Sequence, residues 1–145
     1  MRGLLSRWVF AVAAVLFVGV GGAHAAGVSA ADEKAVRAVI QAQLDAFAAD
    51  DAARAFSLAA PGIREMFGTA DRFMAMVRTG YPVVYRPASV VFLKPELVDN
   101  EVIQGVRMTD ARGASWLAIY KMQRQPKNIW RIGGCQVVQN DERLT

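Results

Sequence analysis

Apolar residues in the first part of the chain recur at helical spacing. Along 32–49 they fall on a single stripe, formed by Val36, Val39, Ile40, Leu44 and Phe47. Such a stripe is typical of a helix with one face against a core. Ser29 followed by Asp32 predicts the start of this helix, since a serine side chain can accept the N–H three residues further on.

Shorter helical segments follow. Asp50-Asp51 interrupts the stripe and can cap a second helix, which we expect Pro61-Gly62 to end. Segment 63–67 predicts a helical turn that stops near Gly68. Asp71 predicts the start of a third helix that ends at Gly80, with a buried side made of Phe73, Met74, Met76 and Val77.

Beyond residue 90 the period changes from helical to alternating. This alternation predicts four strands, at 90–93, 102–109, 115–123 and 130–138. Short turns at 110–113 and 126–128 favour antiparallel pairing. Helices followed by strands are the α+β order. We therefore expect N-terminal helices packed against a curved, cone-like antiparallel sheet of four or slightly more strands.

The third predicted strand is apolar on both faces. Trp116, Ala118 and Tyr120 alternate with Leu117 and Ile119. A strand with one face in water would be polar on that face. We expect one face to cover the helices and the other to meet a second subunit, which predicts a homodimer through the sheet.

The beginning of the chain predicts an export signal. Arg2 and Arg7 precede an apolar run over 8–20, and Ala23-His24-Ala25 gives the small-x-small pattern before a cleavage point at Ala26. A run of about 13 residues is short for a membrane span, which favours cleavage over anchoring. Residues 1–25 are thus predicted to be a signal peptide, and the protein to be periplasmic or secreted.

The remaining chain predicts one α+β domain over 26–138 and a polar tail over 139–145. The formal charge of +4 falls to about +2 without Arg2 and Arg7, and no basic cluster suggests nucleic-acid binding. Cys135 is the single cysteine, which excludes an intramolecular disulfide. A buried, inert thiol is the favoured interpretation, and a disulfide between two chains is the alternative.

Familiar catalytic sets are missing from the sequence. The single histidine, His24, lies in the predicted signal, so zinc and Ser-His-Asp or Cys-His chemistry lack their usual groups. No glycine-rich phosphate loop occurs, and we expect no cofactor or metal. Asp45 lies at the edge of the first stripe, which favours a solvated position over a general base.

Five residues are candidates for a ligand site. Two of them, Tyr81 and Tyr85, lie in Tyr81-Pro82-Val83-Val84-Tyr85-Arg86-Pro87, which joins helix to sheet, and the others are Arg64, Gln104 and Tyr120. Phenols, an amide and a guanidinium could bind an anion or a carbonyl. The alternatives are tyrosines that fill the edge of the core, a surface Arg64, and interface roles for Gln104 and Tyr120.

The chain also resembles a known family. The resemblance rests on segments that include Ala60-Pro61-Gly62-Ile63-Arg64, Tyr81 to Pro87, Trp116-Leu117-Ala118-Ile119-Tyr120 and Trp130-Arg131-Ile132-Gly133-Gly134-Cys135. It covers about 32–138 and is similar to exported bacterial proteins grouped as a domain of unknown function. The element order resembles the cone of nuclear-transport-factor-like proteins and ketosteroid isomerases. That resemblance implies the fold alone, because such cones include enzymes, ligand binders and inert dimers.

These observations favour an exported, non-catalytic module that binds a small ligand or a partner protein. One alternative is a cone-fold enzyme of the isomerase, dehydratase or hydrolase type, for which the sequence offers no base. The other is a structural protein of the cell envelope.

Overall fold

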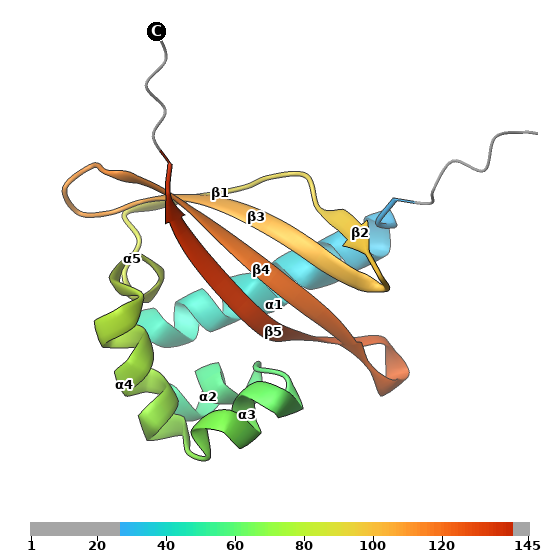
Figure 1. The fold of residues 1–145 in the computed structure, drawn as a ribbon, viewed down its shortest axis with the longest axis horizontal. Helices are drawn as coiled ribbons and strands as arrows, with labels where there is room; N and C mark the ends of the chain where they lie inside the picture. The colour runs from blue at the N-terminus through green and yellow to red at the C-terminus, as the bar shows by residue number, and fades with distance from the viewer. Residues whose placement is uncertain (1–26, 141–145) are drawn as a thin grey trace, which may run out of the picture.

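The computed structural model describes residues 27–140, so the predicted signal peptide and residues 141–145 lie outside the described part. Helices precede strands, which confirms the α+β order (Figure 1). The helices are α1 (Ala30–Ala48), α2 (Ala52–Ser57), α3 (Pro61–Phe67), α4 (Ala70–Gly80) and α5 (Pro82–Tyr85). The strands are β1 (Ser89–Phe92), β2 (Glu96–Val98), β3 (Glu101–Thr109), β4 (Ser115–Gln125) and β5 (Ile129–Gln139). Within the described residues no helix is both long and apolar enough to cross a membrane.

Side-chain caps fix the helix starts much as the sequence predicts. Ser29 Oγ accepts the Asp32 N–H at 3.1 Å, and Asp51 caps α2 by accepting the Arg54 N–H at 3.1 Å. The role predicted for Pro61 was wrong, because it begins α3 rather than ending α2. Proline suits the first position of a helix, where its missing N–H is not needed.

The sheet is an antiparallel meander in the order β1-β3-β4-β5, with β2 also paired to β3. The four predicted strands are all present. The sequence missed β2 because its three residues are all exposed and therefore show no alternation. In Figure 1 the strands curve over α1, while α2, α3 and α4 lie on the side of the sheet that β5 borders.

A bulge in β5 sets which of its side chains face the helices. Ile132 pairs with Met122, but Cys135 pairs with Tyr120, so the register shifts by one residue at Gly133-Gly134. A Cβ at Gly133 would lie 2.6 Å from the Gln123 side chain, so a glycine suits this close approach. The shift places both Ile132 and Cys135 on the inner face of the sheet.

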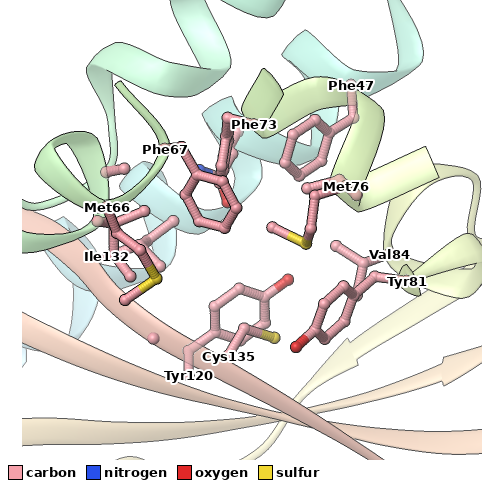
Figure 2. Close-up of a pocket in the computed structure, with 15 residues that line it drawn as sticks. Phe47, Met66, Phe67, Phe73, Met76, Tyr81, Val84, Tyr120, Ile132 and Cys135 are labelled. Atoms are coloured by element: carbon pink, nitrogen blue, oxygen red, sulfur yellow. The ribbon is translucent and has the colours of Figure 1, made fainter. Parts of the chain in front are cut away.

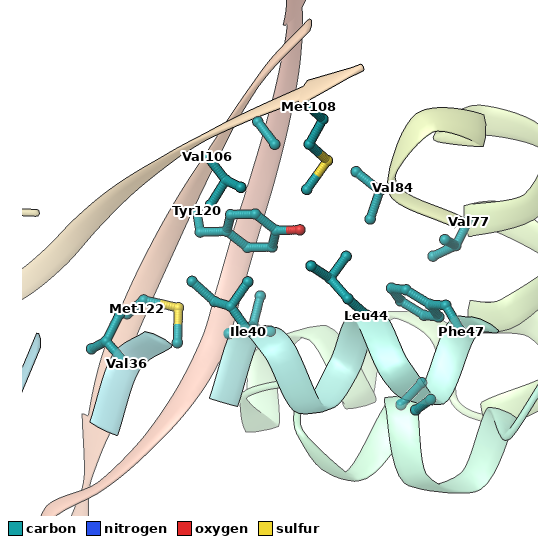
Figure 3. Packing of buried hydrophobic residues seen from close by; sticks show 14 of the residues in the cluster. Val36, Ile40, Leu44, Phe47, Val77, Val84, Val106, Met108, Tyr120 and Met122 are labelled. Carbon is teal, nitrogen blue, oxygen red and sulfur yellow. The ribbon is translucent and has the colours of Figure 1, made fainter. Parts of the chain in front are cut away.

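The core lies between α1 and the inner face of the sheet. Val36, Ile40 and Leu44 of α1 face Tyr120 and Met122 of β4 (Figure 3). Ala118, Tyr120 and Met122 are buried as the alternation of β4 predicts. This packing fixes Tyr120 with its ring in the core and its hydroxyl directed toward the helices.

A second contact fastens the beginning of α1 to the far end of the sheet. The Asp32 carboxylate accepts from Arg124 Nη2 at 2.7 Å and from Trp130 Nε1 at 3.3 Å. The Arg124 guanidinium also lies 4.4 Å from the centre of the Trp130 indole. The hydrogen bond from Arg124 is the main reason that the pKa of Asp32 is lowered.

Candidate inner cavity and outer groove

A cavity of about 390 Å³ lies between α3, α4 and the β4–β5 part of the sheet (Figure 2). This volume is within the range of small-molecule sites. Its helix side is mainly aromatic and apolar. The centre of the Phe73 ring lies 6.0 Å from that of Phe47 and 5.6 Å from that of Phe67. Tyr120, Ile132 and Cys135 form the sheet side. We refer to this space as the inner cavity.

Two methionines make the inner cavity adaptable. Met76 extends its side chain into the space from α4, whereas Met66 of α3 is 73% exposed and marks the rim (Figure 2). Methionine side chains are flexible and polarizable, so they can adjust to ligands of different shape. The wall on the helix side can therefore change shape more readily than the sheet.

The Tyr120 hydroxyl is the unusual polar group of the inner cavity. Tyr120 is only 1% exposed, and among residues 27–140 its hydroxyl makes no hydrogen bond of normal geometry, although it is close enough to the Cys135 thiol to interact with it. Burial raises the pKa of this phenol well above its usual range, so the hydroxyl keeps its proton and can donate. A buried hydroxyl without a partner costs about 1–3 kcal/mol, and native proteins rarely leave one unpaired.

Cys135 lies beside Tyr120 on the neighbouring strand. Burial raises the pKa of its thiol to about 12. The thiolate is the reactive form of cysteine, so the Cys135 thiol is unsuited to act as a nucleophile near neutral pH. Its contribution to the cavity is a small, weakly polar surface.

Gln43 supplies an amide from α1. Its Nε2 donates to the Ala55 carbonyl at 3.0 Å, which fixes the orientation of the side chain. Gln43 is buried and lines the inner cavity. The polar surface of this space thus comes from uncharged groups: amide, phenol and thiol.

A second, more open hollow of about 800 Å³ adjoins the inner cavity; we refer to it as the outer groove. Tyr81 and Cys135 line both spaces, and in Figure 2 the Tyr81 hydroxyl points toward Cys135. These two side chains therefore stand between the cavity and the groove. Arg86, Arg112 and Trp116 also line the groove.

The structure brings together two of the five residues that the sequence suggested. Tyr81 and Tyr120 both line the inner cavity. Tyr85 lies outside it, where its hydroxyl donates to Asp50. Arg86 Nη2 donates to the other Asp50 oxygen at 3.1 Å, so this cluster ties α5 to the end of α1.

Gln104 and Arg64 do not line the inner cavity, although Gln104 is the cross-strand neighbour of Tyr120. Gln104 is fully buried, and its Nε2 donates to the carbonyls of Leu93 at 2.7 Å and Gly105 at 2.8 Å. It thereby holds the chain where β1 ends, which is a structural contact. Arg64 is exposed on α3 and lines neither the inner cavity nor the outer groove.

Comparison with known proteins adds one result to this geometry. Residues 29–145 match a protein family described as a domain of unknown function (DUF4864). The chain belongs to this family. The matched region contains every residue that lines the inner cavity and the outer groove. No curated protein and no solved structure matches the chain.

The side chains that line the inner cavity limit which ligands it can bind. None of the described residues that form its wall is a carboxylate, a histidine, a lysine or an arginine. Residues 27–140 also contain no group of three or more His, Cys, Asp or Glu side chains placed to hold a metal. The arrangement suits binding of an uncharged group, with Tyr120 as the donor.

Sequence reasoning missed part of this wall. The sequence predicts a helical turn for Phe67, a buried helix face for Met76 and a buried thiol or an inter-chain disulfide for Cys135, although all three line the inner cavity. Gln43 did carry a signal, because it is a polar residue within the apolar stripe between Ile40 and Phe47. A polar side chain on a buried helix face indicates either a structural hydrogen bond or a ligand contact, and Gln43 makes the first while lining the cavity.

Proposed function

We propose that this protein is a non-catalytic binding module whose inner cavity takes a small, uncharged, mostly apolar group carrying one hydrogen-bond acceptor. The observation that carries this proposal is the unpartnered Tyr120 hydroxyl at the edge of a 390 Å³ apolar space. A bound acceptor would satisfy that hydroxyl and remove its desolvation cost. Export to the periplasm or beyond, and kinship with nuclear-transport-factor-like cones, are further parts of the proposal and rest on the sequence.

Two features of the wall favour an uncharged ligand. An ion placed among Phe67, Phe73 and Met76 would lose its hydration without gaining a countercharge, which is costly. A carbonyl or ether oxygen loses less hydration free energy than an ion, and it gains a hydrogen bond from the Tyr120 phenol. An isomerase or dehydratase would also need a base in contact with the ligand. The described residues of the wall include no carboxylate, histidine or lysine that could serve as that base.

Tyr120→Phe tests the proposal with a matched pair of probes, acetophenone and ethylbenzene. The two probes have similar shapes, but only acetophenone carries an acceptor oxygen. In the wild-type protein we expect acetophenone to bind about tenfold more tightly, as one net hydrogen bond of about 1.4 kcal/mol implies. In the variant we expect equal affinities. Calorimetric titration measures both.

The same variant gives an independent readout in the absence of ligand. Because the hydroxyl is unpartnered, its removal should raise the free energy of unfolding by about 1 kcal/mol, measured by urea denaturation. A Tyr120→Phe variant that is more stable and no longer distinguishes acetophenone from ethylbenzene would indicate that the hydroxyl serves ligand binding rather than folding. Absence of binding by both probes to the wild-type protein would contradict the proposed function.

The outer face of the sheet supports a second candidate function, contact with another copy of this chain. Val91 is 51% exposed and Val138 is 38% exposed, and Leu117 and Leu93 meet over Gly105 on this face. Arg107 is the cross-strand neighbour of both Val91 and Leu117 on this face. Ile119→Arg would add a second positive charge near it, and we expect this to convert a dimer to a monomer in sedimentation velocity. Ala75→Arg, on exposed α4 surface, is the control, and a monomeric wild-type protein would contradict this candidate.

A further inference from the structure

The outer groove differs chemically from the inner cavity it adjoins. Arg112 lies on its rim, in the turn between β3 and β4, and is exposed. Its backbone N–H is bound by Asp110, but its guanidinium makes no hydrogen bond or ion pair with the described residues. The groove therefore presents an available positive charge close to an apolar space.

The carboxylate of Asp110, two residues before Arg112, already accepts hydrogen bonds within its own turn. Asp110 Oδ1 accepts from the N–H groups of Arg112 and Ala114 at 2.9 and 3.0 Å, and Asp110 Oδ2 accepts from Trp116 Nε1 at 3.0 Å. These bonds direct the carboxylate into its own turn, so Asp110 attracts the Arg112 guanidinium electrostatically without a hydrogen bond to it. The Trp116 bond is the main cause of the lowered pKa of Asp110.

The other arginine of the groove is engaged elsewhere. Arg86 donates to Asp50 at 3.1 Å and to the Ala48 carbonyl at 2.9 Å. Its guanidinium also lies 4.7 Å from the centre of the Tyr85 ring. Among the described residues that line the groove, Arg112 is thus the cation whose guanidinium makes no hydrogen bond and has donors for a ligand.

We propose that the natural ligand is a single-chain amphiphile, with a mostly apolar part that carries one acceptor oxygen in the inner cavity, within reach of Tyr120, and a carboxylate in the outer groove at Arg112. This inference rests on the proposed binding function and names its ligand class. The chain would pass between Tyr81 and Cys135, the two side chains that border both spaces. Tyr81 is half-buried, so a change of rotamer can widen this passage.

This arrangement gives each part of the ligand a matching environment. The apolar part leaves water for an apolar cavity, which supplies most of the binding free energy. The carboxylate stays partly hydrated at the groove, so its contact with an exposed arginine is modest in strength. Arg112 therefore distinguishes acids from uncharged compounds and contributes a smaller share of the affinity.

Decanoate and decanol separate these two contributions, because they share a chain and differ in the head group. At pH 7 we expect decanoate to bind the wild-type protein about fivefold more tightly than decanol in calorimetric titrations. Arg112→Ala should remove this advantage without changing decanol binding, and Arg112→Lys should retain most of it. Arg64→Ala, which alters an exposed arginine outside both spaces, is the matched control. Higher salt should weaken decanoate binding and leave decanol binding unchanged.

The possible results distinguish failure of the carboxylate site at Arg112 from failure of the proposed binding function. Equal binding of decanoate and decanol, or an advantage of decanoate that persists in Arg112→Ala, would overturn the inference while leaving the inner cavity as a binding site. Failure of decanol, decanoate and acetophenone to bind would overturn the proposed function as well.

Discussion

Met76→Trp should weaken decanol binding by at least about a hundredfold while the protein remains folded. Met76 extends into the inner cavity from α4 and is only partly buried, so an indole at this position would occupy the space that a ligand needs (Figure 2). The open side of the cavity gives the larger ring room to settle without forcing the sheet apart. A hundredfold weaker affinity corresponds to a loss of about 3 kcal/mol in the free energy of binding.

The neighbouring position provides the control for this experiment. Ala75 lies on the same helix but is exposed and does not line the cavity, so Ala75→Trp adds the same side chain outside the site. Calorimetric titration with decanol should give wild-type affinity for Ala75→Trp. If Met76→Trp also retains wild-type affinity while thermal unfolding shows it folded, the ligand does not occupy the inner cavity.

Much of the fold could be predicted from the sequence because its signals are local. The stripe along α1, the Ser29 and Asp51 caps, and the alternation in β3 and β4 each depend on residues a few positions apart. β2 escaped prediction because all three of its residues are exposed. Pro61 was misassigned because proline can both end one helix and begin the next.

The candidate site was less predictable because it depends on contacts between distant segments. The Gly133-Gly134 bulge shifts the register of β5 and places Cys135 beside Tyr120, an outcome that simple alternation does not give. The sequence suggests no partner for Tyr85, yet its hydroxyl donates a hydrogen bond to Asp50, 35 positions earlier in the chain. The sequence predicts Tyr81 and Tyr120 as candidates for a ligand site, but their shared cavity forms only when α4 packs over the sheet.

Trp130→Ala should lower the free energy of unfolding by about 3–5 kcal/mol, the range for truncating a large buried aromatic residue. Trp130 is 2% exposed, and it packs beneath Arg124 while its Nε1 donates to Asp32. A domain of this size has a total stability of about 5–15 kcal/mol, so the loss would leave it marginal. Urea denaturation at pH 7 measures the change.

Trp130→Phe and the acid dependence of stability show how this loss divides between packing and hydrogen bonding. We expect Trp130→Phe to lose less than half as much, because it keeps an aromatic ring and removes the bond to Asp32. The pKa of Asp32 is lowered in the folded protein, so its ionised form stabilises the fold above the ordinary value of 3.8. This contribution disappears as the pH falls through the lowered pKa, and Asp32→Asn should make the stability less sensitive to acid. A Trp130→Phe variant as unstable as Trp130→Ala would show that the contact to α1, rather than ring packing, holds this end of the sheet.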